Sequence, residues 1–328
     1  MTLILTASVL EHLASMAETI SAVERGFVDI ARGTAQQPAP LSLHLPSSDA
    51  RYLLMSGLAD TQRLAAVKLL SDIPANREAG LPTQRSSILL ADQLTGETLA
   101  LLDGRVPTRV RTAAASAVAS KHLARPDSST LALIGAGALA IAHVEALLHV
   151  LPIKKVVVWS RTNATIQAFE ARITHRAIEV VAASSIQEAV EAADVLCTLT
   201  PSVEPLVHGE WFRPGLHINA VGARPRPTHR EIDSAGMGRS KVFVDSTETA
   251  VQKSGDLMLA VSEGAISLDD VRGELGAVIS GQIAGRDNDD DITLFNSVGI
   301  GMQDLAIGRL LYDAALRNGL GTDVDMSR

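Results

Sequence analysis

The sequence predicts an α/β protein whose second part contains a doubly wound parallel sheet, and three observations support this prediction. An apolar strand over residues 131–134 runs into a glycine-containing turn and then into a helix-forming segment over residues 140–150. A second apolar strand, over residues 154–162, ends about twenty-five residues beyond the turn, as in a βαβ unit. Strand and helix patterns then keep alternating as far as residue 246. These features are typical of a Rossmann-type domain.

The turn has a Gly-x-Gly-x-x-Ala pattern that starts at Gly135 and ends at Ala140. Gly135 allows a tight turn, Gly137 lets the backbone approach a pyrophosphate, and Ala140 is small enough for close helix packing. The phosphates would lie at the N-terminus of the helix, where free N–H groups favour negative charge. The pattern predicts a dinucleotide site, although similar joints also occur in cores that bind nothing.

The tip of the second strand indicates which dinucleotide is bound. It carries Ser160, Arg161 and Thr162 and no acidic residue. An Asp or Glu there would bind the ribose hydroxyls of NAD, whereas an arginine and two hydroxyls suit a 2′-phosphate. The sequence therefore predicts NADPH, with NADH as the alternative; a solvated surface charge is the other interpretation of Arg161.

The first part of the chain has a different pattern. A short strand is followed by an amphipathic helix expected over residues 9–33, with Ser8 as its N-cap and Gly33 as its stop. Short apolar segments separated by turns then predict meandering strands. A last amphipathic helix, over residues 299–319, is expected to return to this part. We expect an α+β domain over residues 1–115 plus 299–328, and the Rossmann-type domain over residues 116–298.

Composition narrows the function classes. A net charge of −8 over 328 residues argues against nucleic-acid or anionic-membrane partners. No window reaches the roughly twenty apolar residues that span a bilayer. The single cysteine, Cys197, excludes an internal disulfide framework and fits a cytoplasmic location. The histidines lack ligand spacing, so no metal is predicted, and the acidic run over residues 287–291 is expected to be a solvated loop.

Several sequence blocks, taken together and in this order, resemble the ornithine cyclodeaminase/mu-crystallin family over nearly the whole chain. The resemblance implies a homodimer built through the first domain, which would also bind the substrate. It further implies a nicotinamide cofactor on the second domain and a small α-amino or α-imino acid substrate. The blocks that carry the resemblance are residues 67–82, 95–104, 110–140, 159–162, 212–223, 230–233, 242–246 and 254–257.

The resemblance also suggests residue roles in the first domain. Arg111 matches the family arginine that pairs with the substrate carboxylate, and a guanidinium suits this task because it is a planar fork that stays charged. Lys68 matches the active-site lysine, and near Arg111 its pKa would be lowered so that it could donate a proton. Met55 falls where the family lines its pocket. Without the resemblance, Lys68 would be interpreted as a strand lysine that reaches solvent.

The expected cofactor contacts combine the glycine turn, the tip of the second strand and positions near later strand ends. Thr83 and Gln84 lie on a loop that reaches the cofactor in the mu-crystallin branch, although both could be ordinary turn residues. The residues expected to contact the dinucleotide are Thr83, Gln84, Thr112, Gly135, Ala136, Gly137, Ala138, Leu139, Ser160, Arg161, Thr162, Thr198, Thr200, Val221, Gly222, Ser297 and Gly299.

Two departures from the family pattern bear on the reaction. Arg224 stands where the cyclodeaminase branch has an aspartate, and an arginine cannot act as a base at neutral pH, so no residue is evident for that carboxylate role. Pro40 stands where the family has an early arginine that binds the substrate carboxylate. Arg85 and Arg224 are the candidate replacements for it.

We therefore expect NADPH-dependent reduction of a cyclic ketimine, 1-pyrroline-2-carboxylate or 1-piperideine-2-carboxylate, to proline or pipecolate. A reductase needs a carboxylate clamp, a hydride and a proton, and it needs no step that expels ammonia. The alternatives are ornithine cyclodeaminase, in which NAD is recycled, and alanine dehydrogenase or an opine-type synthase. A cofactor-loaded carrier such as mu-crystallin is a further alternative, which the low aromatic content of 3% does not favour.

Overall fold

The computed structural model describes residues 1–174 and 176–326. It divides into two compact units, one of Met1–Arg111 with Gly299–Arg328 and the other of Thr112–Val298. The division falls inside helix α3 (Arg105–Leu123), a few residues before the boundary expected at residue 115.

The first unit is built on a mixed sheet in the strand order β16-β1-β7-β6-β5-β4-β2, with β3 paired to β4. Strands β4 to β7 are consecutive antiparallel neighbours, which confirms the expected meander. The strands are β1 (Thr2–Leu5), β2 (Ala35–Gln36), β3 (Leu41–His44), β4 (Arg51–Ala59), β5 (Leu64–Asp72), β6 (Gln84–Asp92), β7 (Thr98–Asp103) and β16 (Thr322–Val324). The helical segments are α1 (Ala7–Leu13), α2 (Met16–Ala31), η1 (Pro74–Arg77) and α11 (Gly301–Asn318).

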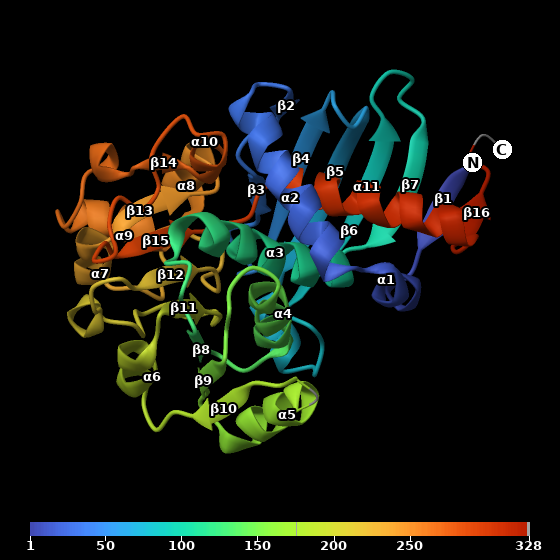
Figure 1. Cartoon of the computed structure of the whole chain (residues 1–328). Coiled ribbons are helices and arrows are strands. Elements are labelled where there is room, and N and C mark those ends of the chain that lie inside the picture. Colours follow the sequence, from blue (N-terminus) through green and yellow to red (C-terminus); the bar gives the residue numbers. More distant parts are fainter. Residues whose placement is uncertain (175, 327–328) are drawn as a thin grey trace. The chain divides into compact units, whose positions relative to one another are not determined.

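Helix α11, the last helix, returns to the first unit as expected. It packs against β4, β5 and β6, and α2 packs against α11 in turn. Figure 1 shows α2 and α11 lying across one face of the meander. That face carries the alternate residues of β5, which are buried, whereas their neighbours along the strand are not.

The expected single helix over residues 9–33 is wrong, because the structure has two helices there. The backbone is extended at Ala14 and Ser15, and the hydroxyl of Ser15 accepts a hydrogen bond from the backbone N–H of Glu18, which starts α2. The N-cap of α1 is Thr6 and not Ser8. The serine was therefore a cap signal in the middle of a continuous apolar pattern.

The second unit is a parallel sheet in the order β10-β9-β8-β11-β12-β15-β13-β14. Its strands are β8 (Thr130–Ile134), β9 (Lys155–Trp159), β10 (Glu179–Ala182), β11 (Val195–Thr198), β12 (His217–Ala220), β13 (Lys241–Val244), β14 (Gly273–Glu274) and β15 (Thr293–Asn296). Its other helical segments are α4 (Ala138–Leu148), α5 (Asn163–Ile173), α6 (Ile186–Ala192), η2 (Gly209–Trp211), α7 (Ser234–Arg239), α8 (Thr247–Lys253), α9 (Gly255–Ser262), η3 (Leu268–Asp270) and α10 (Leu275–Ile279).

Both faces of this parallel sheet are covered, which explains its continuous apolar strands. On β8, Leu131 and Leu133 belong to one apolar core, and Ala132 and Ile134 belong to another on the opposite face. The chain runs from β8 outward to β9 and β10, and then returns to place β11 on the other side of β8. The strand order therefore reverses between β8 and β11. In doubly wound sheets, ligands bind beyond the carboxyl ends of the strands at such a reversal.

The sequence pattern missed β15 and the short helices α7 to α10. Strand β15 inserts between β12 and β13, although it follows β13 in the chain.

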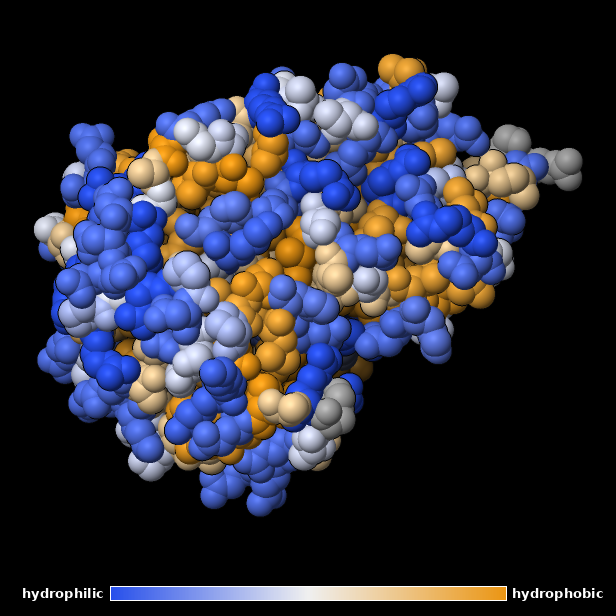
Figure 2. Space-filling view, in the orientation of Figure 1, coloured by the Kyte–Doolittle hydropathy of each residue, from blue (hydrophilic) through white to orange (hydrophobic). Residues whose placement is uncertain are grey.

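Figure 2 shows hydrophilic side chains over much of the visible surface near α7 and α9. Within residues 1–174 and 176–326, no helix is long and apolar enough to cross a membrane.

Candidate functional site

Lys68 is buried inside the first unit. It lies on β5, directly opposite Met55 of β4 and Ile88 of β6, and all three side chains are on the face that packs against α11. The exposed fraction of Lys68 is 0%. A lysine so completely buried needs a partner or a lowered pKa, and Lys68 has both. This rules out the interpretation of Lys68 as a strand lysine that reaches solvent.

The start of α11 approaches β4 very closely because of glycine. A Cβ atom placed on Gly301 would lie 2.1 Å from the carbonyl oxygen of Ser56. A Cβ atom on Gly57 would lie 3.3 Å from the backbone of Gly301. The two glycines let helix and strand backbones touch, so the first turn of α11 reaches the buried face of the sheet. The side chains of that turn therefore meet Lys68.

A buried ionic cluster results. The Nζ of Lys68 lies 2.7 Å from Oδ2 of Asp304, and the Nε of Arg111 donates to Oδ1 of the same carboxylate at 3.1 Å. The Nη1 of Arg111 donates to Oε1 of Gln303 at 2.5 Å. Two cations share one carboxylate in this cluster, so its excess positive charge suits an anionic group of a substrate.

The electrostatics of the cluster favour a lysine that exchanges its proton. Burial and then the positive charge of Arg111 lower the pKa of Lys68 from 10.5 to about 8, while the charge and hydrogen bonding of Asp304 act in the opposite direction. At neutral pH Lys68 is therefore an ammonium that gives up its proton more readily than a free lysine.

Gly299 makes room for the guanidinium of Arg111. Its φ angle is +92°, and a Cβ atom there would lie 3.1 Å from Nη1 of Arg111. Gly299 was expected to contact the cofactor. In the first unit its observed role is to let the chain pass close to Arg111.

Sequence reasoning missed Asp304 and Gln303. Both follow Gly301 in the first turn of α11, and both are buried, at 1% exposure for Asp304 and 2% for Gln303. A polar pair at buried positions of an amphipathic helix was the available signal. The structure therefore places a carboxylate beside Lys68 that the sequence analysis did not predict.

The replacements considered for the early arginine do not meet Lys68 inside the first unit. Ile88 of β6 and Lys68 of β5 lie on the same buried face of the sheet, so Arg85, three residues before Ile88, projects from the opposite face. Arg85 is exposed and, with Gln84, lines a surface pocket of the first unit. Arg224 lies in the second unit, half-buried, in a narrow pocket that also contains Ser297.

The glycine turn of the second unit lies at the strand reversal. Gly135 has a φ angle of +115°, and a Cβ atom there would lie 3.0 Å from the carbonyl oxygen of Leu199. The fold itself therefore requires Gly135. Gly137 is different: a Cβ atom there would meet no protein atom within 4 Å. The open space beside Gly137 fits the close approach of a bound pyrophosphate.

The tip of β9 is accessible. Arg161 is exposed, and Ser160 beside it is half-buried. The Thr162 hydroxyl is the N-cap of α5, where it accepts from the backbone N–H of Thr165. The tip therefore offers the guanidinium of Arg161 and the hydroxyl of Ser160 to a ligand. The hydroxyl of Thr162, which was also expected to bind the ligand, caps α5 instead.

Thr198 is not exposed at the carboxyl edge of the sheet. It is fully buried, and its hydroxyl donates to Oε2 of Glu231 at 2.7 Å. Thr200 and Gly222 lie at the carboxyl ends of β11 and β12 and also bond to Glu231. Ser297 is buried and donates to Asp245 at 3.3 Å. Five further residues of the second unit were expected to contact the dinucleotide, and they lie at this edge or on the turns and helices beside it: Thr112, Ala136, Ala138, Leu139 and Val221. Thr83, the remaining expected contact, precedes β6 in the first unit.

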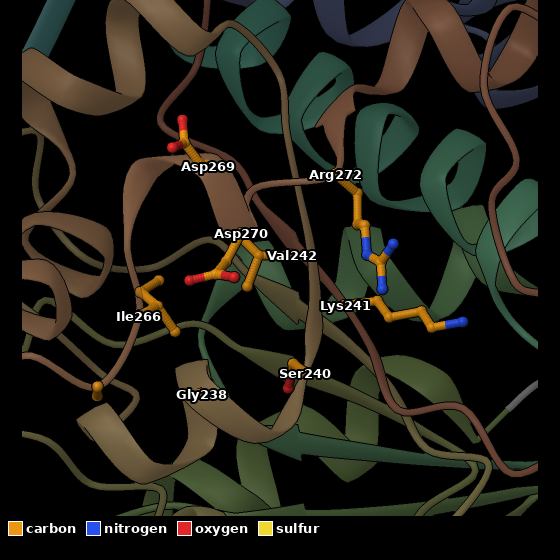
Figure 3. Close-up of a pocket in the computed structure, with 9 residues that line it drawn as sticks. Gly238, Ser240, Lys241, Val242, Ile266, Asp269, Asp270 and Arg272 are labelled. Atoms are coloured by element: carbon orange, nitrogen blue, oxygen red, sulfur yellow. The ribbon is translucent and has the colours of Figure 1, made fainter.

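A further pocket, of about 390 Å³, contains none of the expected site residues. Figure 3 shows Lys241 and Arg272 side by side, with Asp270 across from them. Lys241 starts β13, so this pocket lies at the amino ends of the strands, at the edge of the sheet opposite to the glycine turn. The Nζ of Lys241 is paired with Asp287 and Asp291 of the acidic run, at 2.5 and 2.6 Å. That run is therefore partly an ion-pair network and not simply a solvated loop.

The parallel sheet with a glycine turn at its strand reversal defines the second unit as a Rossmann-type domain. The ornithine cyclodeaminase/mu-crystallin family model matches residues 1–319, and the chain belongs to this family. Among the described residues, no group of three or more His, Cys, Asp or Glu side chains could hold a metal ion.

Several known proteins resemble the chain along nearly its whole length. A Δ1-pyrroline-2-carboxylate reductase of Bacillus thuringiensis is 34% identical, over 98% of this chain and 99% of its own. The Δ1-pyrroline-2-carboxylate reductase of Thermococcus litoralis, solved with NADH and L-proline, is 38% identical with a TM-score of 0.93, over 98% of this chain and 100% of its own. An archaeal alanine dehydrogenase dimer with bound NAD is 35% identical with a TM-score of 0.93, over 99% of both chains.

Proposed function

We propose that this protein reduces a cyclic ketimine, 1-pyrroline-2-carboxylate or 1-piperideine-2-carboxylate, to proline or pipecolate, with NADPH as the preferred donor. The observation that carries the proposal is the buried cluster of Lys68, Asp304 and Arg111. The two pyrroline-2-carboxylate reductases among its relatives, one of them solved with L-proline, support this substrate class.

The reaction needs one hydride and one proton, and the cluster suits the second of these. A bound nicotinamide would supply the hydride to the imine carbon. The Lys68 ammonium, with its pKa lowered to about 8, would donate the proton to the imine nitrogen. Asp304 would keep Lys68 in position and help to return it to the charged form.

Arg111 would hold the substrate carboxylate. A guanidinium has five N–H donors, of which Asp304 and Gln303 engage two. Its nearly complete burial would strengthen an ion pair with a carboxylate, because the surrounding dielectric is low. The excess positive charge of the cluster would then be neutralised when the substrate binds.

The dinucleotide would bind to the second unit. The turn at Gly135 and Gly137 would hold the pyrophosphate at the start of α4. Arg161 at the tip of β9 would pair with the 2′-phosphate of NADPH. The exposed position of this arginine supports a preference for NADPH over NADH. NADH stays the alternative donor, because the solved relatives contain NADH and NAD.

We further propose that the protein is a homodimer built through the outer face of the first sheet. Val67, Leu89 and Leu101 are paired neighbours on three adjacent strands, on the face that α11 does not cover. Each is between 38% and 39% exposed, and Leu69 beside them is 48% exposed. Such an apolar row fits a second copy of the chain. We also propose a cytoplasmic location, in line with the buried, unpaired Cys197.

The test is a set of cofactor-oxidation assays with purified protein. We expect rapid NADPH oxidation with 1-pyrroline-2-carboxylate or 1-piperideine-2-carboxylate, and slower oxidation with NADH. Pyruvate with ammonia tests alanine dehydrogenase, and ammonia release from ornithine tests cyclodeaminase, for which Asp304 would supply the base. Activity in either of these assays with no imine turnover would overturn the proposal.

A variant pair connects the activity to the cluster. Lys68→Met should abolish imine reduction while NADPH binding is kept, because the proton donor is lost and the side-chain volume is nearly retained. Lys154→Met, at an exposed lysine of the second unit, is the matched control and should keep full activity. Imine reduction that persists in Lys68→Met would remove Lys68 from the mechanism.

A further inference from the structure

Glu231 is a fully buried carboxylate at the carboxyl ends of β11 and β12. Its Oε1 accepts from the backbone N–H and the hydroxyl of Thr200, both at 2.6 Å. Its Oε2 accepts from the hydroxyl of Thr198 at 2.7 Å and from the backbone N–H of Gly222 at 2.8 Å. One side chain therefore ties together the two chain segments that leave these neighbouring strands.

A second buried carboxylate lies next to it. Oδ1 of Asp256 accepts from the backbone N–H groups of Glu231 and Ile232, at 2.8 and 2.9 Å. Burial, with the nearby charge of Asp256, raises the pKa of Glu231 to about 7, and the hydrogen bonds from Thr200 and Thr198 oppose this rise. Burial also raises the pKa of Asp256 to about 6, against the positive charge of Arg230 and hydrogen bonds from Ile232 and Glu231.

Holding two loops together with two neighbouring buried acids carries a large desolvation free energy. Packed apolar side chains or neutral amides would avoid this cost. Perturbed acids of this kind are concentrated at functional sites. Their place in the fold agrees with this, because the carboxyl edge between β8 and β12 is where doubly wound sheets bind ligands.

The two segments held by Glu231 are also in direct backbone contact. A Cβ atom on Gly222 would lie 2.2 Å from the backbone nitrogen of Thr200. Leu199, just before Thr200, is the residue whose carbonyl oxygen approaches Gly135 of the glycine turn. Small movements at Glu231 would therefore be passed to the wall of the crevice next to that turn.

We propose that Glu231 is a positioning residue, which as a carboxylate locks the segments after β11 and β12 into the geometry that accepts the dinucleotide. This rests on the proposed function, because it assumes that a dinucleotide binds in the crevice. Glu231 itself does not touch the cofactor and acts through Thr200 and Gly222.

The lock depends on the charge of the carboxylate. The backbone N–H groups of Thr200 and Gly222 can only donate, so both need an acceptor on Glu231. A protonated carboxyl has one oxygen that is a donor and a weaker acceptor, so at least one of these bonds weakens as Glu231 gains a proton. The titratable groups near Glu231 include Asp256, which Arg230 influences in turn, and Cys197, whose thiol pKa is raised by burial and by the charge of Glu231. Cofactor affinity should therefore fall as the pH decreases through about 7.

The experiment measures the dissociation constants of NADH and NADPH by fluorescence without substrate, from mildly acidic to mildly alkaline pH. Both nucleotides are needed, because the 2′-phosphate of NADPH has its own pKa of about 6. Glu231→Gln should weaken binding by roughly tenfold and flatten the pH dependence, since its NH₂ group leaves one backbone N–H without an acceptor. Thr198→Val removes one of the four donors, and it should move the midpoint of the pH dependence upward.

Asp194→Asn is the matched control. Asp194 also ties strand ends together, by accepting from the backbone N–H groups of Ser129 and Thr130 at 2.9 Å, but at the amino ends of the strands. This variant should lower the melting temperature and leave both the dissociation constants and the pH midpoint unchanged.

The outcomes separate the two proposals. A folded Glu231→Gln variant with the affinity and pH profile of the wild type would overturn the role of Glu231 alone. If that variant does not fold, an unmoved midpoint in Thr198→Val has the same meaning. A wild-type protein that binds neither nucleotide would overturn the proposed function and, with it, the role of Glu231 at a cofactor site.

Discussion

Oδ2 of Asp304 lies 2.7 Å from Nζ of Lys68, and both side chains are almost completely withdrawn from solvent. A buried pair of this kind sets the protonation of the lysine, because neither charge can be screened by water. The charge of Asp304 and its hydrogen bond raise the pKa of Lys68, against the larger lowering by burial and Arg111.

The first prediction concerns the alkaline side of the pH profile. In the wild type, kcat/KM for imine reduction should fall above about pH 8, because Lys68 loses the proton that it must donate. Asp304→Asn removes the influence that raises this pKa, so the fall should begin at a lower pH and activity at neutral pH should drop. The pH dependence of kcat/KM at saturating cofactor measures both effects.

The control for this experiment lies on the same helix. Asp313, paired with Arg309 at 2.9 Å on the surface of α11, is changed to Asn. This pair is half-buried at the surface and lies away from Lys68 along the helix, so its loss should have little effect on activity and only a small effect on stability. An Asp304→Asn variant whose alkaline limb is unchanged would show that Asp304 does not control the proton of Lys68.

The second prediction separates glycine required by the fold from glycine required by the ligand. Gly137→Ala should keep the free energy of unfolding or raise it by about 0.4–1 kcal/mol, because its φ is −82° and its Cβ position is open. NADPH binding should weaken by roughly tenfold or more, because the methyl group fills the space for the pyrophosphate. Gly135→Ala should destabilise the fold by roughly 1–3 kcal/mol, because its φ is +115°.

Thermal unfolding without ligand and NADPH titration measure the two effects independently. Unchanged NADPH affinity in Gly137→Ala would mean that no pyrophosphate approaches the backbone there.

The third prediction tests the choice of cofactor. Arg161→Ala should raise the KM for NADPH by roughly ten- to a hundredfold, the loss expected for a charge-assisted hydrogen bond, and leave the KM for NADH nearly unchanged. Arg172→Ala, at an exposed arginine of α5, is the control and should change neither. Equal effects of Arg161→Ala on both cofactors would argue against a contact with the 2′-phosphate.

The parts of the structure that the sequence could predict are those with a local signal. The continuous apolar strands of the second unit and the glycine turn follow from burial on both faces and from backbone geometry. The break between α1 and α2 also has a local signal, because Ser15 is a good N-cap residue. The signal was not recognised because the apolar pattern continues on both sides of Ser15. Strand β15 was missed because it follows the acidic run over residues 287–291 and not a predicted helix, although it lies between β12 and β13 in the sheet.

The site was only partly predictable, because its members come from distant parts of the chain. Lys68 is one of the alternate residues of β5 that face the core. Its role in the site was inferred from the family resemblance and not from the strand pattern alone. No local signal connects Asp304 with Lys68, since their contact depends on Gly301 and Gly57 allowing α11 to approach β4. Glu231 was similarly missed, because its four donors come from two separate segments of the chain, at residues 198–200 and at Gly222.

The last prediction concerns the proposed dimer. Leu89→Asp puts a charge in the middle of the apolar row on the outer face of the first sheet, where β6 pairs with β5 and β7. In a symmetric dimer each substitution occurs twice, so two carboxylates would be buried at the interface and the apolar contact of two leucines, about 1.5–3 kcal/mol each, would be lost. We expect sedimentation to show a dimer for the wild type and a monomer for Leu89→Asp. Leu316→Asp, at a 55% exposed leucine of α11, should stay a dimer. A dimeric Leu89→Asp variant would place the interface on another surface of the chain.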